Sequence, residues 1–575
     1  MYRIGELLSL LGVSFQEAKH KPTIRIEAGE MSRIVDAAEQ ELATTGKYYQ
    51  RGGLIVSITT DPSTFETGIR PLSQNSLLKA MSSCAVWTRF DQRSGADVVA
   101  DPPTRHVAIL HDTEKYHHLP PLAGIVRQSH LRSDGTLVRD AGYDPGTRMF
   151  GVFDARQFAT PDRPTKADAH AALAEIQGVL SEFRFAADYD LSAAISGLLT
   201  AAIRQSLPTA PMYHYRAPQP ASGKSYLQAI TAAFAGPGSA SAVAFPVNEE
   251  ECQKPLLATL LSAPAVIAFD NLTTDILPHK SLCSALTEEF LTGRILGVSK
   301  TATVGTRALV LSSGNNVDAI RDMPRRCITV SLDPQVETPA TREFNSDPLS
   351  VIRANRARFV SMALTIVRAS IVSGEPALQC RTLASYGQWT QWVRQPLMWL
   401  GLPDPAERIF ARMAEDPDHE TLGRMLHQWY MHFGSSSTRV RDAILAASGF
   451  GDDDLREILM EVAEQRQEIN GRRLGRWLSR HEARIVDGMR FERAGGTSSV
   501  DRWIARKVAQ GASAGESQSA MSVTSVKSVK SVKSVKSVKS VKSVKSVKSV
   551  KSVKSVSSSQ PAQSVSDPDY CEVTL

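Results

Sequence analysis

The chain has 575 residues, with 66 Lys and Arg against 60 Asp and Glu, and therefore a formal net charge of +6. This length suffices for about three or four domains, and a hydrophobic content of 42% argues against a wholly disordered protein. The six cysteines are scattered without close pairing, which argues against a disulfide framework or a zinc site and fits a reducing compartment. No apolar run has membrane-spanning length and no apolar leader follows the start, so we expect a cytoplasmic protein without a membrane partner.

The excess of positive charge lies in one segment near the end of the sequence. A Ser-Val-Lys repeat at 525–554 contains ten lysines, whereas residues 1–515 hold 56 basic and 56 acidic side chains. One valine in every three residues cannot form a core, so residues 511–575 are predicted to be a disordered tail. Two interpretations of the repeat stay open: a salt-sensitive contact with a polyanion, or an expanded repeat without a role.

Residues 1–160 are predicted to form an α/β N-terminal domain. Residues 54–58 and 106–110 have the apolar content of strands, and residues 30–44 have the spacing of a helix. No cluster of metal-binding carboxylates stands out in this region, so priming activity is not predicted.

The sequence Ser222-Gly223-Lys224-Ser225 lies between two predicted elements. An aromatic run at 212–216 precedes it as a strand, and a helix that begins near Tyr226 follows it. In this arrangement backbone N–H groups surround phosphates, Lys224 reaches the β and γ oxygens, and the Ser225 hydroxyl binds Mg²⁺. The pattern G-x-x-x-x-G-K-[ST] asks for Gly where the chain has Pro218. The residues predicted to bind ATP are Pro218, Ala221, Ser222, Gly223, Lys224 and Ser225.

Polar or charged residues stand at the ends of the next three predicted strands. A carboxylate comes first, then two amides, then two arginines. The strand at 265–269 ends in Asp270, a carboxylate that can hold a Mg²⁺ water. The strand at 308–311 leads to Asn315 and Asn316, whose amides can orient the attacking water or sense the γ-phosphate. A third strand, at 327–330, follows an arginine pair that can act on a neighbouring subunit's nucleotide. The predicted catalytic residues of an ATPase core at 208–335 are Lys224, Asp270, Asn315, Asn316, Arg325 and Arg326, with Ser225 and Asp270 as the Mg²⁺ ligands.

These segments resemble those of phage- and plasmid-type replicative helicases and primase-helicases, whose motor is a P-loop ATPase of the superfamily 3/AAA+ kind. The similar motor segments are 217–225, 266–271, 313–316 and 322–326, and looser similarity extends to 101–103, 120–122, 142–144 and 399–405. The resemblance implies an ATP-dependent DNA helicase or translocase of mobile-element DNA replication, with ATP and Mg²⁺ as cofactors. The implied partners are DNA, further copies of the chain in a hexamer, and a primase or polymerase.

Asn271 departs from these motors, which carry a catalytic glutamate at this position. An amide cannot act as a general base. Glu249, Glu250 and Glu251 are alternative bases, or they complement the dipole of the helix that they are predicted to begin. Without a base, the alternative function is a nucleotide-switched DNA-binding or loading factor with weak or no hydrolysis. The missing glycine at Pro218 favours a third alternative, a degenerate P-loop scaffold.

Two regions are candidates for contact with DNA. A hairpin is predicted at 294–307 with Lys300 near its tip, and in the motors that the chain resembles such a hairpin grips the nucleic-acid backbone with a basic side chain. A winged-helix-like domain is predicted at 436–510, from a helix at 453–466, a second helix capped by Asn470, and a hairpin at 484–491 around Asp487-Gly488. The second helix presents Arg473, Arg476 and Arg480 on one face, for DNA or for a protein partner.

The predicted fold class is α/β, with an AAA+-like parallel-sheet P-loop core between other regions. Residues 161–207 are predicted to be helical, because apolar side chains recur three and four residues apart. Residues 336–435 form a second helical region, which carries Trp389, Trp392 and Trp399. The α/β N-terminal domain and the winged-helix-like domain complete the predicted order.

Overall fold

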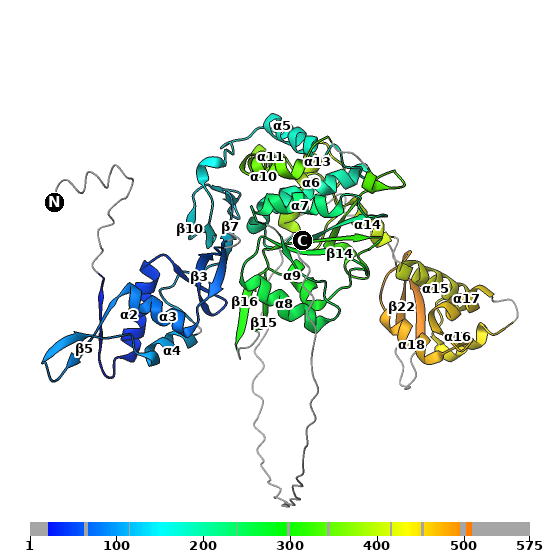
Figure 1. The fold of residues 1–575 in the computed structure, drawn as a ribbon. Helices are drawn as coiled ribbons and strands as arrows, with labels where there is room; N and C mark the ends of the chain where they lie inside the picture. The colour runs from blue at the N-terminus through cyan, green and yellow to red at the C-terminus, as the bar shows by residue number, and fades with distance from the viewer. Residues whose placement is uncertain are drawn as a thin grey trace, which may run out of the picture. The chain divides into compact units, whose positions relative to one another are not determined.

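A computed structural model describes residues 21–508 except 63–66, 114, 239, 296–299, 342–344, 415–416, 450–452 and 495–501 (Figure 1). The tail predicted at 511–575 lies outside the described residues. The described protein is mixed α/β, with one five-stranded parallel sheet, several small sheets and many helices. No described helix is both long enough and apolar enough to cross a membrane.

The N-terminal region contains two small sheets and three helices around a shared core. Its core side chains include Ile34, Leu77, Trp87 and Leu110. One sheet pairs β1 (Thr23–Ile26), β5 (Val86–Asp91) and β6 (Ala96–Val99), and the other pairs β2 (Tyr48–Arg51), β3 (Leu54–Thr60) and β4 (Thr67–Pro71). The helices are α2 (Met31–Thr44), α3 (Gln74–Cys84) and α4 (Thr104–Asp112).

The strand predicted at 106–110 is wrong, because this segment belongs to helix α4. Pro103 stands at the N-cap, and the buried residues His106, Val107 and Leu110 lie on one helical face. Their spacing of one and four residues is that of a helix, whereas a half-buried strand alternates every second residue. The helix predicted at 30–44 and the strand predicted at 54–58 are confirmed as α2 and β3.

Short strands and two long helices connect this region to the large sheet. The strands are β7 (Gly124–Val126), β8 (His130–Leu131), β9 (Leu137–Val138), β10 (Gly142–Asp144) and β11 (Met149–Gly151). Within residues 161–207, which are predicted to be helical, the structure has α5 (Lys166–Val179) and α6 (Asp188–Ile203). A capping box of Thr165 and Asp168 begins α5. Almost every residue of α6 is buried, which is typical of a central helix.

The large sheet has the strand order β13-β14-β17-β12-β18, and all its pairings are parallel. Its strands are β12 (Met212–Ala217), β13 (Ser241–Ala242), β14 (Val266–Leu272), β17 (Leu309–Asn315) and β18 (Cys327–Ser331). Between them lie α7 (Lys224–Ala235), α8 (Glu249–Leu261), α9 (Lys280–Thr287) and the hairpin of β15 (Phe290–Arg294) and β16 (Thr301–Gly305). The carboxyl ends of parallel strands meet at one edge, so polar residues at these ends are brought together.

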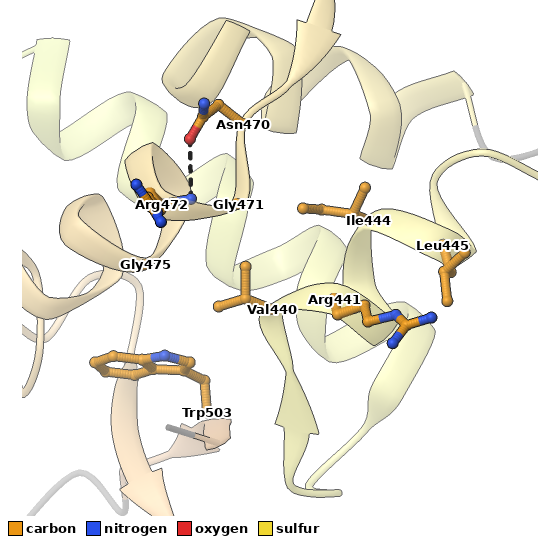
Figure 2. A pocket seen from close by; sticks show the side chains of 9 residues that line it. All are labelled: Val440, Arg441, Ile444, Leu445, Asn470, Gly471, Arg472, Gly475 and Trp503. Carbon is orange, nitrogen blue, oxygen red and sulfur yellow. Dashed lines mark hydrogen bonds between the residues drawn. The ribbon is translucent and has the colours of Figure 1, made fainter. Parts of the chain in front are cut away.

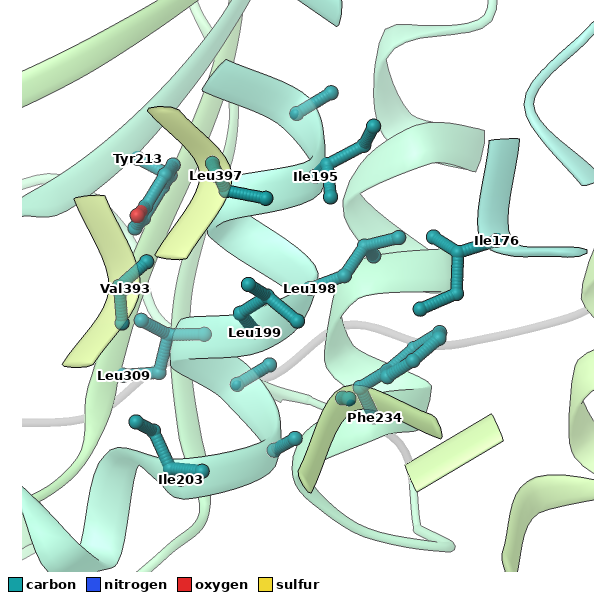
Figure 3. Packing of buried hydrophobic residues seen from close by; sticks show 14 of the residues in the cluster. Ile176, Ile195, Leu198, Leu199, Ile203, Tyr213, Phe234, Leu309, Val393 and Leu397 are labelled. Atoms are coloured by element: carbon teal, nitrogen blue, oxygen red, sulfur yellow. The ribbon is translucent and has the colours of Figure 1, made fainter. Parts of the chain in front are cut away.

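Both faces of the large sheet are covered, which explains the continuous apolar runs of its strands. Alternate residues of β17 face opposite sides: Leu309 and Leu311 belong to the core around α6 and α7, and Val310 belongs to the core around α8 and α9. Figure 3 shows the first core, where Leu198 and Leu199 lie between Leu309 and Phe234.

The helices after the sheet pack onto the same core. They are α10 (Pro348–Ala354), α11 (Arg356–Ser373), α12 (Gly387–Trp389), the π-helix η5 (Thr390–Arg394), α13 (Gln395–Trp399) and α14 (Glu407–Ala414). Trp389 is fully buried, and its indole Nε1 donates to Thr200 Oγ1 on α6 at 2.9 Å.

The C-terminal region has a separate core that includes Trp429, Phe491 and Trp503. Its helices are α15 (Pro417–Phe433), α16 (Val440–Ala446), α17 (Asp453–Ala463) and α18 (Gly471–Arg480). A sheet of order β19-β23-β22 joins β19 (Thr438–Arg439), β22 (Met489–Ala494) and β23 (Arg502–Lys507), and β20 (Glu464–Gln465) pairs with β21 (Glu468–Ile469).

Two boundaries predicted in this region are wrong. Helix α17 ends at Ala463 instead of 466, because β20 begins there. The hairpin predicted at 484–491 is only a turn at Asp487-Gly488, across which Val486 pairs with Met489. The long hairpin of this region is formed by β22 and β23. The turn itself has positive φ at both central residues, 48° and 70°, as a type I′ turn requires. The predicted cap is confirmed: the Asn470 side chain accepts from the N–H groups of Arg472 and Arg473.

Truncation of the central helix tests this packing. We expect Leu198→Ala to lower the free energy of unfolding by about 2–5 kcal/mol, because it leaves a cavity between α6 and the sheet. Urea unfolding followed by tryptophan fluorescence measures the loss. Leu378→Ala is the matched control, because Leu378 is 42% exposed, and its unfolding free energy should stay within about 0.5 kcal/mol of the parent. Equal losses in the two variants would contradict the assignment of the core.

Candidate functional site

The loop between β12 and α7 forms hydrogen bonds with itself. Gln219 O accepts from Lys224 Nζ at 2.9 Å and from Ser222 Oγ at 2.5 Å. Gly223 is the N-cap of α7 and has φ +89°, a conformation that favours glycine. A Cβ on Gly223 would also meet the Phe183 ring at 3.3 Å. No described side chain caps α7, so its first N–H groups are available for an anion.

Lys224 is buried in this loop, with 7% of its surface exposed. Burial lowers the pKa of its ammonium group, and the nearby Asp270 carboxylate acts in the opposite direction. The ammonium group is thus close to a carboxylate but hydrogen-bonded to a neutral carbonyl. A bound phosphate would offer it a stronger, charged acceptor than Gln219 O.

Two hydroxyl groups, one from a helix and one from a strand, meet the Asp270 carboxylate. Ser225 Oγ on α7 donates to Asp270 Oδ1 at 2.9 Å, and Ser313 Oγ on β17 donates to the same oxygen. The described residues contain no group of three His, Cys, Asp or Glu side chains that could hold a metal ion alone. Mg²⁺ commonly binds through one or two protein oxygens together with phosphate oxygens. The Ser225 and Asp270 oxygens therefore fit a nucleotide-bound Mg²⁺.

A bulge in β14 places Asp270 at this point. Phe269 pairs with Ser312 and Leu272 pairs with Gly314, so two residues of β14 lie opposite one residue of β17. The second of the two, Asn271, has φ 55°, and its N–H donates to Asp270 Oδ1 at 3.0 Å and to Ser313 Oγ at 3.2 Å. The bulge thus redirects the strand end while side chains satisfy the freed N–H group.

Asn315, which ends β17, and Asn316, which follows it, lie beside the same loop. Asn315 pairs with Ala217 in the sheet, and its side-chain Oδ1 is buried without a hydrogen-bond partner. Asn316 donates from Nδ2 to Pro218 O and from its backbone N–H to Ala217 O, both at 3.2 Å. The structure thus brings Asn316 into direct contact with the loop that contains Lys224.

The two candidate arginines differ in exposure. Arg326 is 8% exposed, and its Nη1 donates to Asp322 O at 2.9 Å. Arg325 keeps 41% of its side-chain surface exposed and contacts the Asp322 carboxylate through two nitrogens. Of the pair, Arg325 is therefore the side chain that a neighbouring molecule can reach.

The three glutamates considered as bases lie at the start of α8. Glu249 accepts from Ser281 Oγ at 2.6 Å and from the N–H groups of Lys280 and Ser281, which caps α9. Glu250 pairs with Lys254 at 2.5 Å on the surface. Glu251 accepts a long hydrogen bond of 3.4 Å from the N–H of Val247. None of the hydrogen bonds of these described residues links them to the loop at Lys224.

A hollow of about 400 Å³ adjoins the loop. It is lined by Glu182, Phe183, Ala221, Ser222, Gly223, Tyr226, Ser346, Asp347 and Pro348. The rings of Phe183 and Tyr226 are stacked with centroids 6.2 Å apart, and the Tyr226 hydroxyl donates to Asp347. The sequence did not reveal this hollow, because its walls come from segments before α6 and before α10, far from the loop motif.

The candidate DNA contacts of the C-terminal region lie on α18. Arg473, Arg476 and Arg480 are exposed, and none of them forms an ion pair within the described residues. Arg473 donates to Glu464 O at 2.7 Å. On the adjoining strands, by contrast, Arg490 and Arg506 both pair with Glu492. Helix α18 therefore presents three exposed arginines that no carboxylate of the described residues pairs with.

A hollow of about 730 Å³ lies between α16 and α18 (Figure 2). Val440 and Ile444 contribute its apolar wall, Trp503 lies at one end, and Arg441 and Arg472 stand at the rim. Gly475 on α18 leaves open space there, since a Cβ at this position would meet nothing within 4 Å.

Comparison with known proteins gives structural similarities only. No family model matches the chain. No curated protein matches it either. The apo structure of the NrS-1 C-terminal region is 11% identical, covers 82% of this chain and 99% of its own, and superposes with a TM-score of 0.33. A JCV helicase with a bound small molecule is 12% identical, covers 41% of this chain and 61% of its own, and has a TM-score of 0.22. These TM-scores are too low for either superposition to assign a function.

A buried histidine behind the site makes the stability depend on pH. His214 on β12 has Nδ1 2.9 Å from Ser312 Oγ and Nε2 3.0 Å from Val317 O, which fits a neutral ring with the proton on Nε2. Burial lowers the pKa of His214 to about 4, from an ordinary value of 6.5. Between these values the unfolded chain binds a proton that the folded chain excludes, so stability falls as the pH falls.

We expect His214→Gln to lose less stability on acidification. As the pH falls from 6.5 towards 4, the unfolding free energy of the parent should decrease more steeply than that of the variant. The difference should be about 1.4 kcal/mol for each pH unit. Urea unfolding at pH 7 and pH 5 measures the difference. His427→Gln is the control, because His427 is exposed, and it should keep the parent's pH dependence. An unchanged slope in His214→Gln would contradict the assignment.

Proposed function

We propose that the protein is an ATP-dependent DNA helicase or translocase that acts in the replication of a mobile element. The observation that carries the proposal is the convergence of Lys224, Ser225 and Asp270 beside an uncapped helix N-terminus. Together they offer a cation, a hydroxyl, a carboxylate and N–H donors to a triphosphate with Mg²⁺. Asn315 or Asn316 would sense the γ-phosphate, and the exposed Arg325 would act on the nucleotide of a neighbouring copy in a hexamer.

The hollow beside the loop supports a nucleobase in the same site. A base could stack against Phe183 and Tyr226, whose rings already face each other in a stack. The carboxylates of Glu182 and Asp347 accept hydrogen bonds and are suited to an exocyclic amino group such as that of adenine. These acceptors favour ATP over nucleotides whose bases would present a carbonyl oxygen to the two carboxylates.

The C-terminal region supports contact with DNA. Helices α16 to α18 followed by the hairpin β22–β23 have the order of a winged-helix module, with α18 as the helix that would enter a groove. The exposed arginines of α18 would contact phosphates or bases. We propose that this region is the winged-helix-like domain. We also propose that the successive domains and helical regions of the chain end at residues 160, 207, 335 and 435.

A nucleotide-switched DNA-binding or loading factor is the second candidate, and Asn271 favours it. Its amide cannot accept the proton of an attacking water. The hydrogen bonds of Glu249 and Glu250 tie these carboxylates to α9 and to Lys254, which leaves them poorly suited to replace the missing base. In this function ATP would organise assembly while turnover stays slow.

Substitution of the loop lysine separates these functions. In the full-length chain we expect ATP hydrolysis that single-stranded DNA stimulates, and Lys224→Ala should lower kcat/KM by about 100-fold or more. Lys254→Ala is the matched control, because Lys254 is an exposed lysine paired with Glu250, and it should keep the parent's turnover. ATP binding with negligible turnover in the parent would support the switch. A parent that binds no ATP would overturn both.

The base pocket has its own test. Phe183→Ala should raise the Kd for ATP by about tenfold, because stacking of one aromatic pair is worth about 0.5–1.5 kcal/mol. Binding of inorganic triphosphate should not change, since phosphate contacts are retained. Phe185→Ala serves as control, because Phe185 is a neighbouring aromatic residue that does not line the hollow. Isothermal titration calorimetry gives the affinities, and an equal loss for triphosphate would contradict a base at Phe183.

A further inference from the structure

Lys300, the residue expected to grip DNA, is bound by the N-terminal region. Its Nζ donates to Asp112 Oδ1 and to His111 O, both at 3.2 Å. Both acceptors lie at the C-terminal end of α4, where the helix dipole is negative. A carboxylate and a helix-end carbonyl thus offer the ammonium group the same kind of negative charge as a DNA phosphate.

Other contacts fix the N-terminal region beside the hairpin. Arg51 is 5% exposed, and its Nη2 donates to Leu260 O at the end of α8 at 3.0 Å. The Ile69 N–H donates to Ser262 O at 3.3 Å. These bonds involve α8 and its following residue, so they do not depend on Lys300.

Gly52 touches the hairpin directly. A Cβ on Gly52 would lie 3.1 Å from Thr303 O and 3.3 Å from Ala302 Cβ on β16. Its φ is +57°, so two constraints, the backbone conformation and the close approach, favour glycine there. Gly53 has φ +77° as well, but a Cβ there would meet nothing within 4 Å.

The contact at Lys300 is easier to release than the contacts around it. The ion pair is partly exposed, with 26% of the Lys300 side-chain surface and 58% of the Asp112 side-chain surface open to solvent. Partly exposed pairs contribute little to stability, whereas a phosphate backbone brings many charges and releases counterions. DNA can therefore replace Asp112 without displacing the buried Arg51.

We propose that the N-terminal region competes with DNA for the β15–β16 hairpin, because the Asp112 carboxylate binds Lys300 where a DNA phosphate would otherwise bind it. DNA binding then releases the hairpin from α4, and the protein without DNA holds its gripping lysine covered. The inference rests on the proposed function only in taking DNA as the ligand of Lys300.

The affinity of the full-length chain for a fluorescein-labelled oligothymidylate, measured by fluorescence anisotropy, tests the competition. Asp112→Asn should bind about three- to tenfold more tightly, because the competing charge is lost. Asp97→Asn is the matched control: it removes an exposed carboxylate of the same region that pairs with Arg25, and it should bind like the parent. Lys300→Ala should bind more weakly, and Asp112→Asn should bring no gain in the Lys300→Ala background.

A second pair of variants changes the contact without changing charge. Gly52→Ala should tighten DNA binding, because its methyl group meets the hairpin, and Gly53→Ala should not, although it carries similar backbone strain. Thermal melting shows whether each variant folds. If Lys300→Ala binds like the parent, the hairpin does not grip DNA, and the ATPase measurements still decide the proposed motor. If Lys300→Ala weakens binding while Asp112→Asn and Gly52→Ala leave it unchanged, the competition is overturned.

Discussion

The site depends on one constraint, the parallel alignment of β14, β17 and β12. Parallel strands place their carboxyl ends at one edge, so residues separated by many positions in the sequence reach one loop. The bulge in β14 contains Asp270 and Asn271, and the Asp270 Oδ1 lies 2.9 Å from Ser225 Oγ. The geometry of the candidate Mg²⁺ ligands is thus a property of strand pairing as well as of the motif.

Burial gives this edge of the sheet its unusual polar chemistry. Lys224 is buried although much of its loop is exposed, His214 is kept neutral behind the strand ends, and the Asn315 Oδ1 lacks a partner. Each of these groups would be better satisfied in water, so the fold pays a cost for placing them here. Such groups concentrate at functional sites because a bound ligand can satisfy them. The same reasoning separates Arg325 from Arg326, since only the exposed one can reach another molecule.

The sequence predicted the local parts of this molecule well and the assembled parts less well. Four strands of the large sheet and the helix after Gly223 were predicted from apolar runs and helical spacing, and the structure has them, whereas the two-residue strand β13 (Ser241–Ala242) was not predicted. The segment at 106–110 has five mostly apolar residues that fit either element, and Pro103 at the N-cap together with the burial of adjacent His106 and Val107 indicates a helix. Phe183 and Asp347 could not be assigned to the site, because their positions depend on packing of α5, α6 and α10. Ser313 had a signal: it stands two residues before Asn315 and so shares its strand face.

One hydrophobic cluster runs from Leu131 through the sheet to Ile409 and includes side chains of α5, α6, α11 and α13. The helices before and after the sheet therefore complete its covering layer, and α6 in particular is buried on nearly every side. A fragment cut at 208 and 335 would lose that layer and expose the apolar face of β12 and β17 to water. The smallest unit suitable for expression and crystallisation thus extends well beyond the sheet, into both flanking helical regions, whereas the C-terminal region has a core of its own and can be removed separately.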